Sequence, residues 1–327
     1  ARRAPSRGER RTARLPHMAA PHPILKSYTT YLADTDKSSA TSAIVALTDD
    51  IRRSTATTMM GLRDELQLAG EALKSCPDAP ISIGSLCELF VRFVTRIQEQ
   101  MEDLTDFEAV KRLLVERGET FARTSLDART QIAQLGAPLI EDGAVVLTHG
   151  YSRVLVALFL TAAKTKHFSV MVAESHPGGS GHTTARKLIE EGVPVTVVED
   201  CAVAHVMPRC QMVLCGAEAV VESGGVVSKT GTYQMAIVAE ACKRPFYVAA
   251  ESTKFARMFP LSQHDLPKSE SKREHAAFVG LGPPPNNLVA EKPSRDYTPP
   301  CYITLLFTDL GVLTPSAVSD ELIKLFD

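Results

Sequence analysis

The spacing of apolar residues changes near Gly136, and this change constrains the fold more than any other feature of the chain. From Pro23 to about Leu135, apolar residues recur every three or four positions. Examples are Leu62, Leu66, Leu68 and Leu73. Such spacing places them on one face of a helix. The sequence therefore predicts a helical N-terminal domain over residues 23–135.

Helix boundaries within this region can be predicted from polar and proline residues. Ser54 and Ser85 carry hydroxyls that can accept hydrogen bonds from free backbone N–H groups, so helix starts are predicted there. Pro77 and Pro80 predict a break between two helices, because proline lacks the N–H that a helix interior needs.

After Gly136 the pattern becomes short β-branched runs that alternate with helical stretches. The runs are Ala144–Leu147, Phe168–Ala173, Val193–Val198, Met212–Cys215, Phe246–Ala249 and Tyr302–Phe307. Runs that are apolar on both faces suit parallel strands covered by helices. The predicted fold class is α/β, with the helical domain followed by a Rossmann-like parallel-sheet domain over residues 136–327. The polar, proline-rich stretch Gln263–Pro299 is predicted to be an exposed, mobile insertion.

Composition excludes several classes of protein. The 327 residues are 44% hydrophobic and 23% charged, which suits two packed domains. A formal net charge of −2 gives no basic field for nucleic acid or an acidic membrane surface. No run approaches the roughly 18 apolar residues of a membrane span. Residues 1–22 are expected to form a disordered tail; for the six arginines of residues 1–17, an organelle transit peptide is the alternative.

The cysteines indicate a reducing compartment. There are seven, with no C-x-x-C pair and no histidine at metal-ligand spacing, so a cytoplasmic protein without a metal site is expected. Cys210 and Cys215 are the closest pair, and they flank an apolar run in which buried free thiols are common. A metal site there is the alternative.

Polar residues concentrate after three of the predicted strands, where an α/β sheet forms its crevice. The first segment holds His149, Gly150, Tyr151, Ser152 and Arg153. Here a predicted strand is followed by a helix, whose N-terminus offers free N–H groups to an anion. Arg153 adds a positive charge, so a phosphate site is predicted. A tight turn with a hydrogen-bonded histidine is the alternative.

The second segment, Glu174–Gly181, is a glycine-rich turn that includes His176 and does not match G-x-G-x-x-G. The third joins residues 216–218, which include Glu218, to residues 224–232, which include Ser228, Lys229 and Thr230. It does not match a phosphate-binding P-loop, because positions 223 and 228 are serines rather than glycines. Lys229 could still bind one phosphate as a point charge, and a solvated loop lysine is the alternative.

These three segments, preceded by a helical domain, resemble one superfamily over about Ile24 to Phe326. It contains methylthioribose-1-phosphate isomerases, ribose-1,5-bisphosphate isomerases and the alpha, beta and delta subunits of initiation factor 2B. Two segments, Val115–Glu119 and the long ending Tyr302–Ile323, resemble the alpha-subunit family in particular.

The resemblance also implies that catalytic groups are missing. In the isomerases a cysteine follows the Thr-His of the first loop and an aspartate follows the Gly-Ala of the third, and together they move protons between sugar carbons. Here these positions hold Gly150 and Glu218. Glycine cannot ionise, and the longer glutamate displaces its carboxylate, so isomerase activity is not expected. His176 replaces an arginine and Ser228 an asparagine of the isomerases, while Lys229 is retained.

The implied role is therefore regulatory, with no catalytic residues and no cofactor. The resemblance implies a homodimer that joins the beta and delta subunits in a nucleotide-exchange complex and helps sense the phosphorylated alpha subunit of initiation factor 2. Helices that include Thr57 to Leu66 are the implied surface for that phosphoprotein. The remaining pocket is hypothesised to bind a sugar phosphate or a nucleotide monophosphate. The enzyme alternatives are an active sugar-phosphate isomerase and a nucleotide-binding enzyme.

Overall fold

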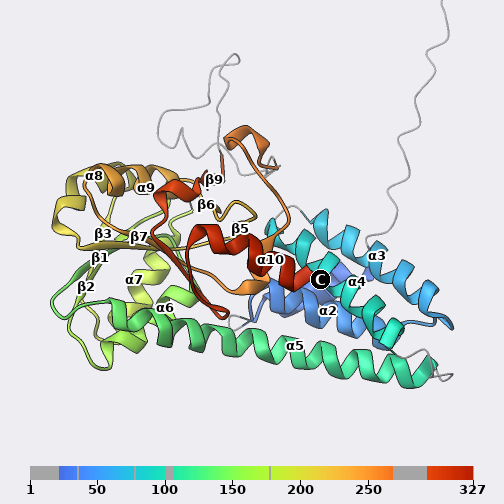
Figure 1. Cartoon of the computed structure of the whole chain (residues 1–327). Coiled ribbons are helices and arrows are strands. Elements are labelled where there is room, and N and C mark those ends of the chain that lie inside the picture. Colours follow the sequence, from blue (N-terminus) through green and yellow to red (C-terminus); the bar gives the residue numbers. More distant parts are fainter. Residues whose placement is uncertain are drawn as a thin grey trace, which may run out of the picture.

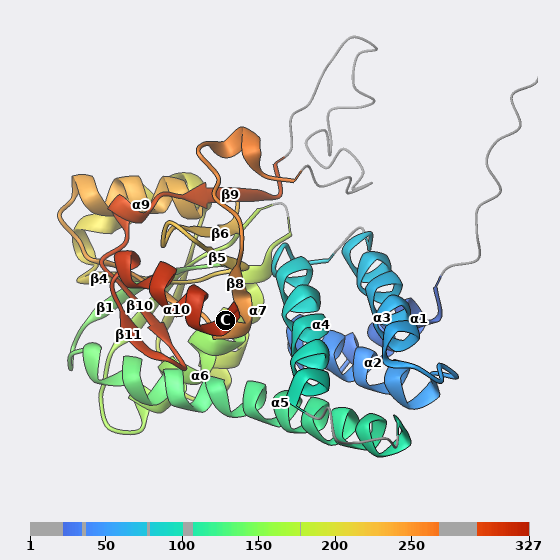
Figure 2. The same ribbon diagram turned by 45° about the vertical axis from the view of Figure 1, so that its right-hand side comes forward.

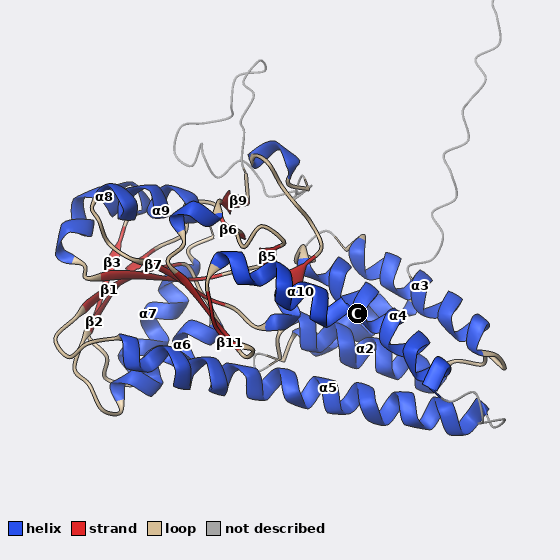
Figure 3. Cartoon of the chain, in the orientation of Figure 1, coloured by secondary structure: helices blue, strands red, loops and turns tan. Residues whose placement is uncertain are grey.

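The computed structural model describes residues 22–34, 37–76, 79–100, 107–176, 178–267 and 293–326. A helical part and an α/β part lie side by side, and one long helix, α5, runs along both (Figure 1). Among the described residues, strands lie only in the α/β part (Figure 3). The predicted fold class is confirmed, and the boundary at residues 135–136 stays a prediction.

The helical part buries the apolar faces that the spacing predicts. Its helices are α1 (Pro23–Leu32), α2 (Ser39–Arg53), α3 (Met59–Lys74), α4 (Ser82–Gln100) and α5 (Phe107–Gly136). Leu62, Leu66 and Leu73 are buried in one core with Ile44 and Leu47 of α2. Leu68, which falls off this stripe, is 60% exposed. A single core therefore fixes the arrangement of α1 to α5.

The predicted helix starts at Ser54 and Ser85 are wrong. Ser54 ends α2, and its hydroxyl donates to Glu65, while Thr58 caps α3 by accepting from the Gly61 N–H at 3.1 Å. Ser85 lies inside α4, which begins at Ser82. In both cases a tertiary contact engages the serine hydroxyl: Glu65 accepts from Ser54, and the Arg257 N–H donates to Ser85. The break at Pro80 is confirmed, and Pro77 lies outside the described residues.

The α/β part is built on a seven-stranded sheet with the order β11-β10-β7-β4-β1-β2-β3. The strands are β1 (Val145–His149), β2 (Ser169–Ala173), β3 (Val195–Val198), β4 (Met212–Gly216), β7 (Phe246–Ala249), β10 (Leu305–Thr308) and β11 (Gly311–Leu313). Neighbours pair in parallel except β10 and β11, which are antiparallel. Each of the six predicted runs contains one strand, so the parallel sheet is confirmed. Tyr302, the first residue of the last run, instead ends the 3-10 helix Pro300–Tyr302.

Helices cover both faces of this sheet (Figure 1). They are α6 (Arg153–Ala163), α7 (Ser180–Glu190), α8 (Val203–Val206), α9 (Thr232–Ala241) and α10 (Val318–Phe326). One core contains buried residues of α8, α9 and α10, and a second contains Ile132 of α5, Leu158 of α6 and Leu188 of α7. No helix among the described residues is long and apolar enough to cross a bilayer.

A second, four-stranded sheet was not predicted. Its order is β8 (Phe255–Ala256), β5 (Ala219–Val221), β6 (Val226–Lys229) and β9 (Arg295–Thr298). It lies beside the start of α4, near the junction of the two parts (Figure 2). Ala219, Val221 and Val227 pack in its small core with Ile81 of the helical part.

The prediction of an exposed, mobile insertion over Gln263–Pro299 is corrected by this second sheet. Residues 268–292 lie outside the described residues, but the two ends of the segment are packed. Tyr297 of β9 is buried, and the Gln263 side chain pairs with its backbone, donating to its carbonyl at 2.6 Å and accepting from its N–H at 2.7 Å. The polar composition concealed β9, because its side chains hydrogen-bond inside the fold.

Candidate functional site

A cavity of about 390 Å³ lies where the carboxyl ends of β1, β4 and β7 meet the helical part. Seven of the residues predicted from sequence line it. They are His149, Tyr151, Ser152, Arg153, Glu218, Ser228 and Lys229. The predicted residues Gly150, Glu174, His176 and Thr230 do not line it.

The first segment places its side chains at the start of α6. The Ser152 hydroxyl caps α6 by accepting from the Leu155 N–H at 3.4 Å. Arg153 donates to the Lys37 carbonyl, so it joins the α/β part to the helical part. The Tyr151 ring lies beneath the Lys187 ammonium, which is 5.5 Å from the ring centroid. The N-terminus of α6 and Arg153 thus face the cavity together, as an anion site requires.

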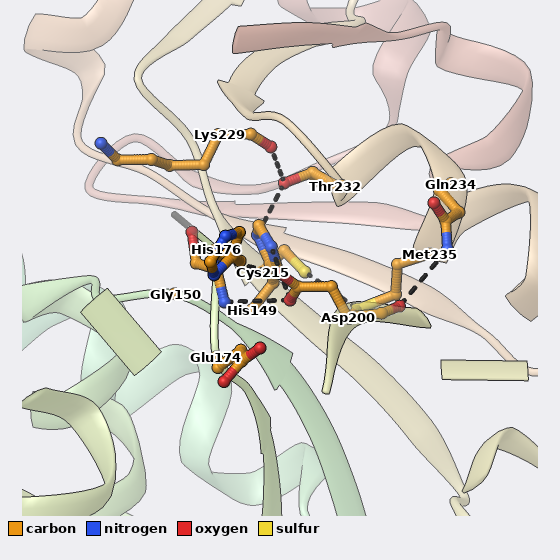
Figure 4. A network of polar contacts seen from close by, with 12 residues as sticks. His149, Gly150, Glu174, His176, Asp200, Cys215, Lys229, Thr232, Gln234 and Met235 are labelled. Atoms are coloured by element: carbon orange, nitrogen blue, oxygen red, sulfur yellow. Dashed lines mark hydrogen bonds and ion pairs between the residues drawn. The ribbon is translucent and has the colours of Figure 1, made fainter. Parts of the chain in front are cut away.

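His149 of the first segment contacts Thr232 of the third segment and Asp200 (Figure 4). It is 7% exposed, its Nδ1 lies 3.2 Å from the Thr232 hydroxyl, and its Nε2 lies 3.7 Å from an Asp200 carboxylate oxygen. Burial lowers the pKa of His149; Asp200 opposes this shift and Lys229 adds to it. The histidine is therefore held neutral, as a structural link rather than a cation for a ligand.

Asp200, which sequence reasoning missed, holds the second segment in place. Its carboxylate accepts from the backbone N–H groups of Ser175 at 2.9 Å and His176 at 2.6 Å. The Glu174 side chain lies 3.8 Å from the ring of His182. Glu174 and His176 consequently shape the loop that neighbours the cavity.

Gly150 occupies a backbone conformation that other residues rarely adopt. Its φ is +62°, and a Cβ there would lie 3.1 Å from the Ser180 Oγ and 3.4 Å from the Ser175 Cβ. Its carbonyl accepts from the Thr184 hydroxyl at 2.7 Å. The position provides no ionisable group, and its surroundings fit glycine.

Glu218 does not project into the cavity as a free base. One carboxylate oxygen lies 2.8 Å from the Arg295 Nε and accepts from the Ile81 N–H at 3.0 Å. The other oxygen accepts from the same Arg295 nitrogen at 3.0 Å. Both carboxylate oxygens are therefore engaged by neighbouring groups of the chain.

The third segment divides into structural and exposed groups. The Ser228 hydroxyl donates to the Gly216 carbonyl at 3.0 Å, and the Thr230 hydroxyl donates to the Pro293 carbonyl at 2.7 Å. Lys229 is exposed, and its side chain points away from the His149 network (Figure 4). No ion pair joins it to another described residue. Of the third segment, Lys229 alone offers a charge to an anion.

Several cavity residues were not predicted from sequence. From the helical part come Ser38, Ser39, Ala40, Pro80 and Ser82, and from the α/β part come Val154, Glu251, Lys254, Ser294 and Arg295. Gly216, Ala217 and Thr232 also line the cavity, and they belong to the predicted third segment. Ser38 carries a readable signal, since it caps α2 through the Thr41 N–H. The others reach the cavity only through tertiary packing, which no local pattern reports.

Glu251 is the second carboxylate of the cavity wall, and it is 2% exposed. The Lys254 ammonium lies 2.7 Å from one of its oxygens, and the Arg129 Nε of α5 lies 3.6 Å from the other. Burial alone would raise the pKa of Glu251, but Lys254 and Arg129 outweigh it and lower that pKa. Both cavity carboxylates are thus paired with cations.

Comparison with known proteins agrees with the resemblance stated from sequence. The profile of the initiation factor 2 subunit family matches residues 33–315. The chain is 48% identical over 300 residues to the translation initiation factor eIF2B subunit alpha of Dictyostelium discoideum, covering 90% of this chain and 93% of that protein. It is 29% identical over 285 residues to the ribose 1,5-bisphosphate isomerase of Thermococcus kodakarensis, covering 86% of this chain and 87% of that protein.

A solved structure shows the same fold. A chain of the tetrameric eIF2B-beta2-delta2 complex from C. thermophilum matches with a TM-score of 0.74 at 19% identity, covering 92% of this chain and 94% of that chain. The N-terminal helices and the sheet domain thus form one shared arrangement.

Proposed function

The chain belongs to the initiation factor 2 subunit family, and on that premise we propose that it is a non-catalytic regulatory subunit of the initiation factor 2B guanine-nucleotide exchange complex. The observation that carries the proposal is the state of the two positions used for proton transfer in the isomerases. Residue 150 is a glycine with a φ of +62°, and the Glu218 carboxylate is paired with Arg295. Residue 150 therefore has no side chain that could exchange a proton with a sugar, and the Glu218 carboxylate is bound to Arg295 and the Ile81 N–H.

The proposed partners are those of the alpha subunits. The chain forms a homodimer, joins the beta and delta subunits in the cytoplasm, and helps bind the phosphorylated alpha subunit of initiation factor 2. Nucleotide exchange itself is carried out by another subunit. The surface around Thr57 to Leu66 supports the phosphoprotein contact, because α3 presents Met60, which is 73% exposed, next to Arg63. An exposed apolar side chain beside a cation suits a protein interface.

The cavity is proposed to bind a sugar phosphate or a nucleotide monophosphate. Lys229 and the N-terminus of α6, with Ser152 and Arg153, supply the phosphate contacts. Tyr151, His149, Glu218 and Ser228 line the same cavity and would contact the rest of the ligand. A ligand that binds the folded dimer stabilises it by mass action.

Two experiments test the proposal. In a coupled assay, the purified chain should not convert ribose-1,5-bisphosphate or methylthioribose-1-phosphate above the buffer rate. In a capture assay, it should retain phosphorylated initiation factor 2 more strongly than the unphosphorylated form when assembled with beta and delta subunits. Measurable turnover, or equal retention of both forms, would refute the regulatory role.

The ligand is tested separately by thermal melting with ribose 5-phosphate and with AMP. The melting temperature of the wild type should rise with either compound, and Lys229→Gln should reduce the rise. Lys324→Gln is the matched control, because Lys324 is an exposed lysine of α10 paired with Glu321 and does not line the cavity. No rise with the wild type would reject the ligand and leave the subunit role untouched.

A further inference from the structure

Glu218 and Arg295 join the two parts of the molecule at a single turn. Their side chains are 20% and 15% exposed, and both face the cavity. Glu218 accepts from the Ile81 N–H at 3.0 Å, while Arg295 donates to the Ala79 carbonyl at 2.9 Å. Each member of the ion pair thus holds one backbone group of the turn at residues 79–81.

This turn is the link between α3 and α4. The Ile81 side chain packs in the small core of the second sheet, and α4 begins one residue later, at Ser82. Pro80 and Ser82 both line the cavity. The position of the turn therefore sets the start of α4 and one wall of the cavity together.

A further attachment involves Glu251, which lines the same cavity. Arg129 of α5 meets Glu251 at 3.6 Å, and α5 packs along both parts as one continuous helix. Loss of the Glu218 contacts would consequently leave the two parts connected. It would release the Ala79 and Ile81 backbone groups of the turn, which the α5 attachment does not reach.

We propose that Glu218 and Arg295 are positioning residues that hold the 79–81 turn, and with it the first turn of α4, on the α/β part. At this third-segment position the isomerases carry the aspartate that moves protons. Here the longer Glu218 side chain connects the α/β part to the helical part. Glutamate reaches both Arg295 and the Ile81 N–H, and aspartate, one methylene shorter, would not span the same gap. The inference goes beyond the regulatory role and does not depend on any ligand.

Hydrogen exchange at the Ile81 amide in the full-length chain tests the proposal. Glu218→Gln keeps the size of the side chain and one acceptor oxygen but removes the charge that holds Arg295. Exchange at Ile81 should accelerate about 10- to 100-fold, as expected when a hydrogen bond to a charged group is lost. Arg295→Gln should give a similar acceleration, and the double variant should be no faster than either single one.

Ser85→Ala supplies the matched control. The Ser85 hydroxyl accepts from the Arg257 N–H at 3.1 Å, so this change also removes a contact between α4 and the α/β part, away from the cavity. It should leave exchange at Ile81 unchanged. Unchanged exchange in Glu218→Gln, or additive effects of the two single changes, would overturn the proposal.

A second readout separates positioning from general stability. Pro80 and Ser82 line the cavity, so Glu218→Gln should weaken binding of ribose 5-phosphate about tenfold or more, whereas Ser85→Ala should not. Equal affinity in Glu218→Gln and wild type would count against positioning of the cavity wall. If the wild type binds no ribose 5-phosphate, the ligand proposal fails, and exchange at Ile81 still decides the role of Glu218.

Discussion

Replacing Gly118 by alanine tests how closely α2 and α5 pack. A Cβ at this position would lie 2.3 Å from the Thr48 Oγ1 and 3.1 Å from its Cγ2. Thr48 is 2% exposed, and its hydroxyl donates to the Ile44 carbonyl at 2.8 Å, so it cannot rotate away without losing that bond. Gly118 also belongs to the Val115–Glu119 segment that resembles the alpha subunits.

Whether Gly118→Ala raises or lowers the free energy of unfolding depends on one favourable and two unfavourable contributions. Alanine favours a helix interior over glycine by about 1 kcal/mol. Overpacking a well-packed contact costs about 1–3 kcal/mol, and the lost Thr48 hydrogen bond adds about 1 kcal/mol. Gly118→Ala should therefore lower the free energy of unfolding by about 1–3 kcal/mol.

Urea denaturation of four variants measures this effect. Gly84→Ala is the control, because a Cβ there meets only the flexible Lys74 side chain at 3.4 Å, and it should stabilise the protein by about 0.5–1 kcal/mol. Combining Gly118→Ala with Thr48→Ala should cost less than the sum of the two single changes. A Gly118→Ala variant at least as stable as the wild type would refute the packing argument.

Three further predictions concern the buried charges and the missing catalytic groups. Burial raises the pKa of Asp296 to about 7, so its contribution to stability is present below about pH 4 and is lost as the pH rises to about 7. Urea denaturation across this range should show that Asp296→Asn removes this slope; a slope equal to that of the wild type would contradict it. Lys254→Met should destabilise the fold by about 3 kcal/mol in thermal and urea melts, because it breaks the buried pair with Glu251; a loss below about 0.5 kcal/mol would disprove the pairing. Gly150→Cys with Glu218→Asp should not restore isomerase activity in a coupled assay, because position 150 has a positive φ at which a cysteine would be strained; recovered turnover would show that the two changes suffice.

Much of the fold can be predicted from the sequence because its signals are local. The six β-branched runs each contain a strand of the parallel sheet, since burial on both faces requires continuous apolar residues. The helical spacing around Leu62 and Leu66 likewise reports the face that packs in the core. Both features depend on residues close together in the chain.

The second sheet and half of the cavity could not be predicted because they depend on distant partners. β9 reads as a polar segment, and it becomes a strand through the backbone of β6 and the side chain of Gln263. Ser54 and Ser85 resemble helix caps, but Glu65 and Arg257 engage their hydroxyls. The length of Glu218 predicts a displaced carboxylate, whereas its contact with Ile81, 137 positions away, emerges only in the fold.

Purification of the tagged chain from its native cell, with identification and quantification of the bound proteins, tests the central claim most directly. Regulatory-subunit function predicts recovery with the beta and delta subunits of initiation factor 2B in comparable amounts. Recovery of the chain by itself, as a dimer that isomerises a phosphorylated pentose, would contradict it.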